Sequence, residues 1–231
     1  METEVAFQTN DIQLDLSPYD LPGFIAVEGS IGVGKTTLAK RLAHTFNYDT
    51  LLEQAEENPF LEKFYQDRPS AALPTQLFFL FQRVKQLQSL RQGDIFKTVR
   101  IADFLMEKDP IFARVTLDEN ELNLYQMVYD QLTVDAPVPD LVIYLQAPTD
   151  VLLERIHRRG KAMEQQIAPE YLAALNDAYT HFFYYYDQAP LLIVNATEID
   201  VVNCEADYKN LVEFLLTIKS GRHYYNPASH A

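Results

Sequence analysis

Short apolar runs alternate with longer segments of helical spacing along the chain. The runs cover residues 23–28, 50–53, 98–103, 140–145 and 190–195. Residues 142–145 and 191–194 are continuously apolar, a pattern typical of strands buried on both faces. Strands of this kind that alternate with helices predict an α/β domain, with a five-stranded parallel sheet flanked by helices.

The first apolar run leads directly into a glycine-rich turn. Residues 29–36 read Gly-Ser-Ile-Gly-Val-Gly-Lys-Thr, and a helix-like segment follows at 37–43. The backbone N–H groups of such a turn converge on a phosphate, and the next helix directs its positive end to the same point. We therefore predict a P-loop NTPase fold that binds a nucleoside triphosphate, with Lys35 reaching the outer phosphates and the Thr36 hydroxyl holding Mg²⁺. The predicted phosphate cradle is Gly29, Ser30, Ile31, Gly32, Val33, Gly34, Lys35, Thr36 and Thr37.

Two carboxylates lie where strands are predicted to end. Glu53 closes the second apolar run and Asp103 closes the third. Ligands of parallel sheets bind beyond the carboxyl ends of the strands, so both side chains are candidates for the site. Glu53 also belongs to an acidic stretch, 53–57, which a solvated loop would explain, and Asp103 could simply cap a following helix. The neighbouring P-loop favours a functional role for Glu53 and magnesium support by Asp103.

Positive charge is concentrated at residues 155–161, late in a helix that is predicted to begin near Asp150. Arg155 and Arg159 are four residues apart and share a helix face, and Gly160 allows the segment to bend. Cations also suit the negative end of a helix, so a purely structural role is an alternative. We favour an Arg-rich lid that approaches the transferring phosphoryl group.

The apolar helix predicted around 77–87 carries polar residues along one side. Gln76, Phe79 and Arg83 stand at positions i, i+3 and i+7. A glutamine amide offers both a donor and an acceptor, as a nucleobase edge requires, and a phenylalanine suits the flat face of a base. From spacing alone, an exposed Gln and Arg on an amphipathic helix fit equally well.

Composition narrows the class of protein. The 231 residues are 48 % hydrophobic and contain no Pro/Gly/Ser linker, which predicts one domain over 1–231 with loosely ordered ends at about 1–20 and 221–231. The formal net charge of −14 argues against nucleic acid as a partner. No apolar run approaches the length of a membrane span, no secretory signal is evident, and Cys204 has no second cysteine to pair with. We expect a cytoplasmic enzyme with no membrane partner.

Several short motifs resemble the deoxynucleoside kinase family, which includes deoxyadenosine, deoxyguanosine and deoxycytidine kinases. The resemblance covers about residues 23–200. It rests on Glu53, on Glu-Asn-Pro-Phe-Leu-Glu-Lys-Phe-Tyr at 57–65, on Pro-Thr-Gln at 74–76, on Asp-Pro-Ile-Phe at 109–112, and on the Arg-rich segment.

The resemblance implies ATP-dependent phosphorylation of a deoxynucleoside 5′-hydroxyl. Glu53 would act as the general base, and Tyr65 with Glu164 would hold the 3′-hydroxyl. A homodimer is implied as well, formed through helices that follow the second strand. The apolar stripe at 77–87 is compatible with that interface.

The resemblance also implies how the base and the phosphates would be recognised. Gln76 would bind the base edge with Phe79 nearby, and Arg83 with Asp109 would form an ion-paired reader. This pair is found in the purine and cytidine members, which disfavours thymidine. Arg155, Arg159 and Lys161 match the basic positions of the lid.

The chain departs from the family pattern at three places. The third strand usually ends in an acidic residue followed by arginine, whereas Asp103 is followed here by Phe104. Phenylalanine lacks the charge and forked donors of arginine, so either another cation substitutes, with Arg100 as a candidate, or catalysis is weakened. Lys161 replaces the usual lid arginine and Gln54 the usual proline.

Two alternative functions stay open at this point. A nucleoside monophosphate kinase would share the P-loop, sheet and lid, although Glu53 would repel the phosphate of its acceptor. A nucleotide-binding regulatory protein with weak or no transfer activity would account for Phe104.

Overall fold

Six parallel strands form one sheet in the part of the chain that the structure describes, in the order β2-β3-β1-β4-β5-β6. This computed structural model describes residues 14–92, 100–133, 136–197, 199, 201 and 204–226. The strands are β1 (Phe24–Gly29), β2 (Asp49–Leu51), β3 (Arg100–Ala102), β4 (Leu141–Gln146), β5 (Leu191–Asn195) and β6 (Arg222–Tyr225). Each of the five apolar runs overlaps one strand, which confirms the predicted α/β class and parallel sheet.

The prediction of five strands is wrong by one. The sequence also predicted a loosely ordered end at about 221–231, but part of it is a strand. Residues 222–225 form β6, which pairs parallel with β5 from Leu191↔Arg222 to Val194↔Tyr225. The strand reads Arg-His-Tyr-Tyr and lies at an edge, so it lacks the continuous apolar pattern that identified the buried strands. At the other end of the chain, Leu14 and Leu16 pack against the core. The rest of the predicted loose ends, 1–13 and 227–231, lies outside the described residues.

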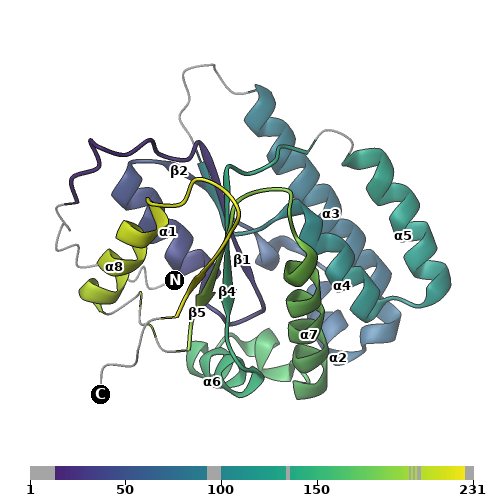
Figure 1. The fold of residues 1–231 in the computed structure, drawn as a ribbon. Helices are drawn as coiled ribbons and strands as arrows, with labels where there is room; N and C mark the ends of the chain where they lie inside the picture. The colour runs from purple at the N-terminus through teal and green to yellow at the C-terminus, as the bar shows by residue number, and fades with distance from the viewer. Residues whose placement is uncertain are drawn as a thin grey trace.

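Helices cover both faces of the sheet (Figure 1), with α1 and α8 on one side and α3, α4, α5 and α7 on the other. The α-helices are α1 (Lys35–Phe46), α2 (Leu61–Gln66), α3 (Arg68–Gln92), α4 (Asp109–Thr116), α5 (Glu119–Leu132), α6 (Thr149–Arg159), α7 (Pro169–Tyr185) and α8 (Glu205–Leu215), and the short 3-10 helices are η1 (Ala55–Glu57), η2 (Met106–Lys108) and η3 (Ala162–Gln166). None of the described helices combines the length and apolar character needed to cross a membrane.

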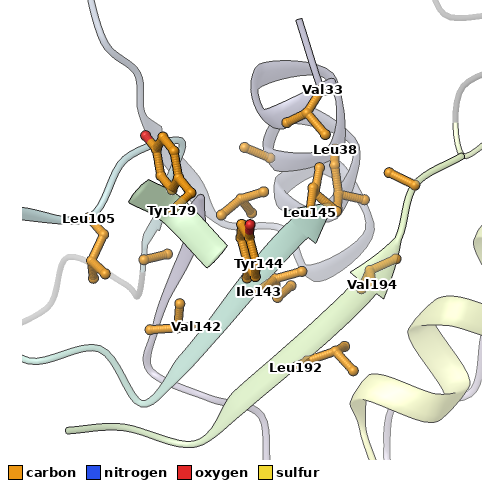
Figure 2. Packing of buried hydrophobic residues seen from close by; sticks show 14 of the residues in the cluster. Val33, Leu38, Leu105, Val142, Ile143, Tyr144, Leu145, Tyr179, Leu192 and Val194 are labelled. Carbon is orange, nitrogen blue, oxygen red and sulfur yellow. The ribbon is translucent and has the colours of Figure 1, made fainter. Parts of the chain in front are cut away.

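The core is centred on the middle strands, whose side chains are covered from both faces. Figure 2 shows Val142, Tyr144 and Leu145 of β4 beside Leu192 and Val194 of β5. Tyr144 stacks on Phe183 of α7, with ring centroids 4.1 Å apart. Because these strands are buried on both faces, they read as continuous apolar runs in the sequence.

Gly29 is the last residue of β1, and both its backbone conformation and its close neighbours disfavour a side chain at this position. Its φ is +150°, and a Cβ there would lie 2.4 Å from the Leu145 carbonyl oxygen and 3.0 Å from Val33 Cγ1. The close contact is with backbone of the neighbouring strand, so it cannot be relieved by a rotamer change. The turn that follows β1 therefore depends on glycine for close packing against β4.

We expect Gly29→Ala to lower the free energy of unfolding by about 2 kcal/mol or more, because backbone strain and the clash add together. Gly160→Ala is the matched control. Gly160 also has a positive φ, of +71°, but has open space around its Cβ position, so a cost of about 1 kcal/mol is expected. Urea unfolding of both variants gives the comparison, and equal midpoints for the two would contradict the packing argument.

Candidate active site

Two cavities adjoin at the carboxyl end of the sheet. The first has a volume of about 730 Å³ and is bordered by the chain that follows β2 and by α2, α3 and η3. The second has a volume of about 820 Å³ and lies between the P-loop, α6 and the chain that follows β5. Gly32 and Arg159 line both. Each cavity is in the size range of small-molecule sites, and the pair can hold two ligands side by side.

The predicted phosphate cradle lies between these cavities. Ile31, Gly32, Lys35 and Thr36 line the first, and Gly32, Val33, Gly34 and Thr37 line the second. Ser30 is buried and Gly29 ends β1 beneath the turn. Gly34 precedes α1, and no side chain caps this helix end, so its positive end faces the turn.

Lys35 bends back over the P-loop. Its Nζ donates to the carbonyl oxygens of Gly29 at 2.7 Å and Ser30 at 3.1 Å. Burial lowers the pKa of the Lys35 ammonium below its usual value, and the nearby Glu28 carboxylate opposes that change. The ammonium is thus positioned at the centre of the turn on which phosphates would converge.

Asp103 connects the P-loop to the end of β2. Its Oδ2 accepts a hydrogen bond from Thr36 Oγ1, and its Oδ1 accepts one from the backbone N–H of Glu53 at 2.7 Å. The following 3-10 helix has Leu105 as its N-cap, so the structure gives no support to the capping alternative for Asp103.

The oxygens of Thr36 and Asp103 are hard ligands of the kind that Mg²⁺ binds. No cluster of three or more His, Cys, Asp or Glu that could hold a metal occurs among the described residues. The two side chains therefore fit a magnesium ion that takes its remaining ligands from phosphates and water, as is common for Mg²⁺ at phosphate sites.

Glu53 accepts hydrogen bonds from two cations. Arg83 donates from one guanidinium nitrogen to Oε1, and Lys108 Nζ lies 3.2 Å from Oε1 and 3.4 Å from Oε2. Burial opposes ionisation of this carboxyl, but Arg83, Lys108 and Lys35 outweigh that effect and lower the pKa of Glu53 to about 2. Glu53 is therefore a carboxylate at neutral pH.

The predicted base-reading residues come together on α3. Gln76, Phe79 and Arg83 all line the first cavity. The Arg83 guanidinium lies 5.2 Å from the centre of the Phe79 ring and donates to Asp109 Oδ1. Asp109 is 2 % exposed and holds Arg83 from behind the cavity wall. The family resemblance implied the pair of Arg83 with Asp109, but it did not imply the contact of Arg83 with Glu53.

The pair predicted to hold a sugar hydroxyl also lines the first cavity. Tyr65 comes from α2 and Glu164 from η3. Burial, with smaller contributions from Tyr171 and Glu164, raises the pKa of Tyr65 well above its usual value, so the phenol stays protonated. A phenol beside a carboxylate can donate to and accept from one hydroxyl group.

The two cations at the end of the basic segment, Arg159 and Lys161, have different partners. Arg159 forms an ion pair with Glu164, and Lys161 forms one with Glu56 of η1. Gly160 ends α6 in the left-handed conformation, so the chain turns between the two cations. Both cations line the first cavity.

The sequence predicted that Arg155 is a lid cation that approaches the transferring phosphoryl group. Its side chain instead binds backbone carbonyl groups. It donates to the carbonyl oxygens of Ala196 at 2.7 Å and Val33 at 3.4 Å. It lines the second cavity together with Arg159, but it is not among the residues of the first. Arg155 thus braces the P-loop against the chain after β5.

Arg100 is not the substitute for the arginine that is missing at position 104. It opens β3, whereas Asp103 follows the end of that strand, so Arg100 lies at the end of the sheet away from the site. Phe104 is 1 % exposed and packs in a second apolar cluster with Leu80 and Tyr125. Two cations contact Glu53, Arg83 and Lys108, and sequence reasoning did not select Lys108.

Glu28 is the other residue that sequence reasoning missed. It is fully buried, and it accepts hydrogen bonds from the backbone N–H groups of Gly29 and Leu105 and from the Tyr179 hydroxyl. The available signal was a carboxylate in an otherwise apolar strand, one residue before the P-loop. A buried carboxylate requires hydrogen-bond partners. Through these partners, Glu28 connects the start of the P-loop to the chain after β3.

Comparisons with known proteins agree with this geometry. Residues 25–218 match the family model described as deoxynucleoside kinase. A deoxyguanosine kinase of Bacillus subtilis (strain 168) is 40 % identical over 157 residues, covering 68 % of this chain and 76 % of that one. A deoxyadenosine/deoxycytidine kinase of the same organism is 30 % identical over 202 residues, covering 84 % and 92 %.

Solved structures give the same result. The structure of a deoxyadenosine kinase from M. mycoides with products dCMP and a flexible dCDP bound has a TM-score of 0.74 and 31 % identity, and the match covers 84 % of this chain and all of that one. The same kinase with bound dATP has a TM-score of 0.73 and 29 % identity, covering 83 % and 98 %. The protein is therefore a member of the deoxynucleoside kinase family.

Proposed function

We propose that this kinase transfers the γ-phosphoryl group of ATP to the 5′-hydroxyl of a deoxynucleoside. The observation that carries the proposal is Glu53, an ionised carboxylate in a cavity that adjoins the P-loop. The acceptor would occupy the first cavity and the donor the second, with its phosphates on the P-loop between them.

The roles of the residues follow from their positions. The 5′-oxygen forms a bond to the γ-phosphorus as the bond from that phosphorus to the bridging oxygen of the β-phosphate breaks, so ADP leaves. Glu53 orients the hydroxyl and receives its proton late, since the transition state of phosphoryl transfer is loose. Lys35 and Arg159 stabilise the charge on the transferred group. Thr36 and Asp103 would hold Mg²⁺, which neutralises phosphate charge when bound.

The base preference is argued from α3. Gln76 is 4 % exposed and lines the cavity, so its amide is available to a base edge in a site that water reaches poorly. Arg83, fixed by Asp109, presents further donors beside it. These groups support a purine deoxynucleoside or deoxycytidine over thymidine, in agreement with the names of the bacterial relatives.

A monophosphate acceptor fits this cavity poorly. The acceptor phosphate would stand near Glu53, and the two cations closest to that carboxylate are already bound to carboxylates. The nucleoside reading is therefore favoured over a nucleoside monophosphate kinase.

Product analysis with ATP and Mg²⁺ tests the proposal. The purified protein is incubated with each of the four deoxynucleosides and, separately, with dAMP and dCMP. We expect 5′-monophosphates from the purine deoxynucleosides or deoxycytidine, less from thymidine, and slow turnover of the monophosphates. ATP binding with no transfer to any acceptor would favour a regulatory nucleotide-binding protein, and restored transfer in Phe104→Arg would strengthen that reading.

We also propose that the enzyme is a cytoplasmic homodimer that pairs through α3 and α5. These helices pack against each other and expose large apolar side chains: Phe81 is 54 %, Leu124 49 % and Met127 68 % exposed. Burial of such side chains would favour association. Sedimentation equilibrium should give twice the 26.6 kDa chain mass, and Met127→Glu should shift the protein towards the monomer. A wild-type monomer at micromolar concentration would contradict the dimer.

A further inference from the structure

A lysine side chain is almost completely buried beside the proposed base. Lys108 is the last residue of η2 and is 1 % exposed. Lysine is rarely buried to this extent unless it is paired, because removing an ammonium from water is costly. Its Nζ lies 3.2 Å from Glu53 Oε1 and 4.0 Å from Glu28 Oε2, so two carboxylates compensate the charge.

The buried Glu28 carboxylate, 4.0 Å from Lys108 Nζ, helps to fix the position of Lys108. That carboxylate accepts hydrogen bonds from the backbone N–H groups of Gly29 and Leu105 and from the Tyr179 hydroxyl, and these three bonds fix its orientation. Lys108 thus stands between the hydrogen-bonded Glu28 carboxylate and Glu53, and both Lys108 and Glu53 line the first cavity. Its three N–H donors suffice for both partners.

The segment around Lys108 is connected to both cations that form ion pairs with Glu53. Leu105, at the start of η2, is tied to Glu28, and Asp109, directly after Lys108, binds Arg83. One short segment therefore supplies a cation to Glu53 and anchors the second cation as well. Phe104, in the same segment, faces an apolar cluster, and its ring centre lies 5.9 Å from the Arg83 guanidinium.

We propose that Lys108 is a positioning residue for phosphoryl transfer, which aims the Glu53 carboxylate into the acceptor cavity and performs the work for which the family pattern has an arginine at position 104. The inference rests on the proposed function. In this chain position 104 is an apolar Phe, and a cation that pairs with Glu53 stands four residues further along, on η2.

Lys108→Met tests this inference, because methionine keeps the length of the side chain and removes the charge. We expect kcat to fall on the order of 100-fold, since the base loses its alignment. The KM for the nucleoside should change less than about threefold, because the ion pairs of the Lys108 ammonium are with Glu53 and Glu28 and not with Gln76, Tyr65 or Glu164. Lys108→Arg should retain more activity than Lys108→Met. The matched control is Lys85→Met, which removes an exposed lysine of α3 and should leave kcat unchanged.

Chemical rescue separates positioning from a structural role. In Lys108→Ala, added ethylammonium should restore part of kcat by occupying the vacated space. If Lys108→Met does not fold, the activity of Lys108→Arg and the ethylammonium rescue of Lys108→Ala still test the role of Lys108.

The outcomes separate this inference from the proposed function. A wild-type enzyme that phosphorylates deoxynucleosides, combined with a Lys108→Met variant of wild-type kcat, overturns the role of Lys108 alone. The absence of ethylammonium rescue in a folded Lys108→Ala variant also counts against it. A wild type that phosphorylates no deoxynucleoside overturns the proposed function itself.

Discussion

Replacing Glu53 with glutamine is expected to lower kcat by about 10²- to 10⁴-fold, the range in which general bases contribute. The variant keeps the shape of the side chain but loses the ability to accept the proton of the 5′-hydroxyl. It also leaves Arg83 and Lys108 facing a neutral amide, although each keeps a second carboxylate nearby, Asp109 and Glu28. The fold and ATP binding should therefore survive.

Steady-state kinetics and calorimetric ATP titration check this expectation. Glu62→Gln is the matched control, because Glu62 is exposed on α2 and lies outside the cavity lining. A Glu53→Gln variant with unchanged turnover would remove Glu53 from the role of base and leave only its ion pairs.

The low pKa of Glu53 also fixes its effect on pH dependence. The folded-state pKa of about 2 lies below the usual 4.5, so the carboxylate stabilises the fold fully above about pH 4.5 and loses that contribution as the pH falls through 2. At neutral pH the group is ionised and ready to accept a proton. We therefore expect no decline of wild-type kcat between pH 8 and about pH 5 from protonation of this residue.

The second large effect is expected for Lys35→Met. Lys35 Nζ is held over the P-loop by two carbonyl oxygens, at the point where the outer phosphates would lie. Loss of this charge should lower kcat/KM for ATP by about 10²- to 10³-fold, the cost of removing a preorganised group from a developing anion. The KM for the nucleoside should change little, since Lys35 contacts none of the residues proposed to bind it.

Lys63→Met provides the control for Lys35→Met. Lys63 is exposed on α2 and outside the cavity lining, so it reports the effect of losing one positive charge from the protein surface. Circular dichroism of both variants monitors the fold. A Lys35→Met enzyme that retains wild-type kcat/KM for ATP would contradict the assignment of the P-loop as the donor site.

The sequence predicts the fold well because the buried elements carry strong patterns. Residues 142–145 of β4 and 191–194 of β5 are continuously apolar, and the P-loop motif predicts where β1 ends and α1 begins. The edge strand β6 was missed, since four residues with polar and aromatic side chains do not form a recognisable strand pattern. Pairing with β5, a tertiary interaction, gives this segment its conformation.

The site was predicted less completely, for a physical reason that Arg83 and Lys108 illustrate. Spacing along α3 places Gln76, Phe79 and Arg83 on one side of a helix, and the structure brings all three to the same cavity. The contact of Glu53 with Arg83 spans 30 positions and that with Lys108 spans 55. Such contacts depend on how elements pack, which periodicity does not encode.

The strand β6 has a consequence for the behaviour of this protein in concentrated solution. Without it, β5 would form the rim of the sheet, and four of its five residues are leucine, isoleucine or valine. An open rim of that kind is a template for strand pairing between molecules. β6 shields it with a four-residue strand that begins with Arg222 and His223, and short charged rims of this type discourage aggregation.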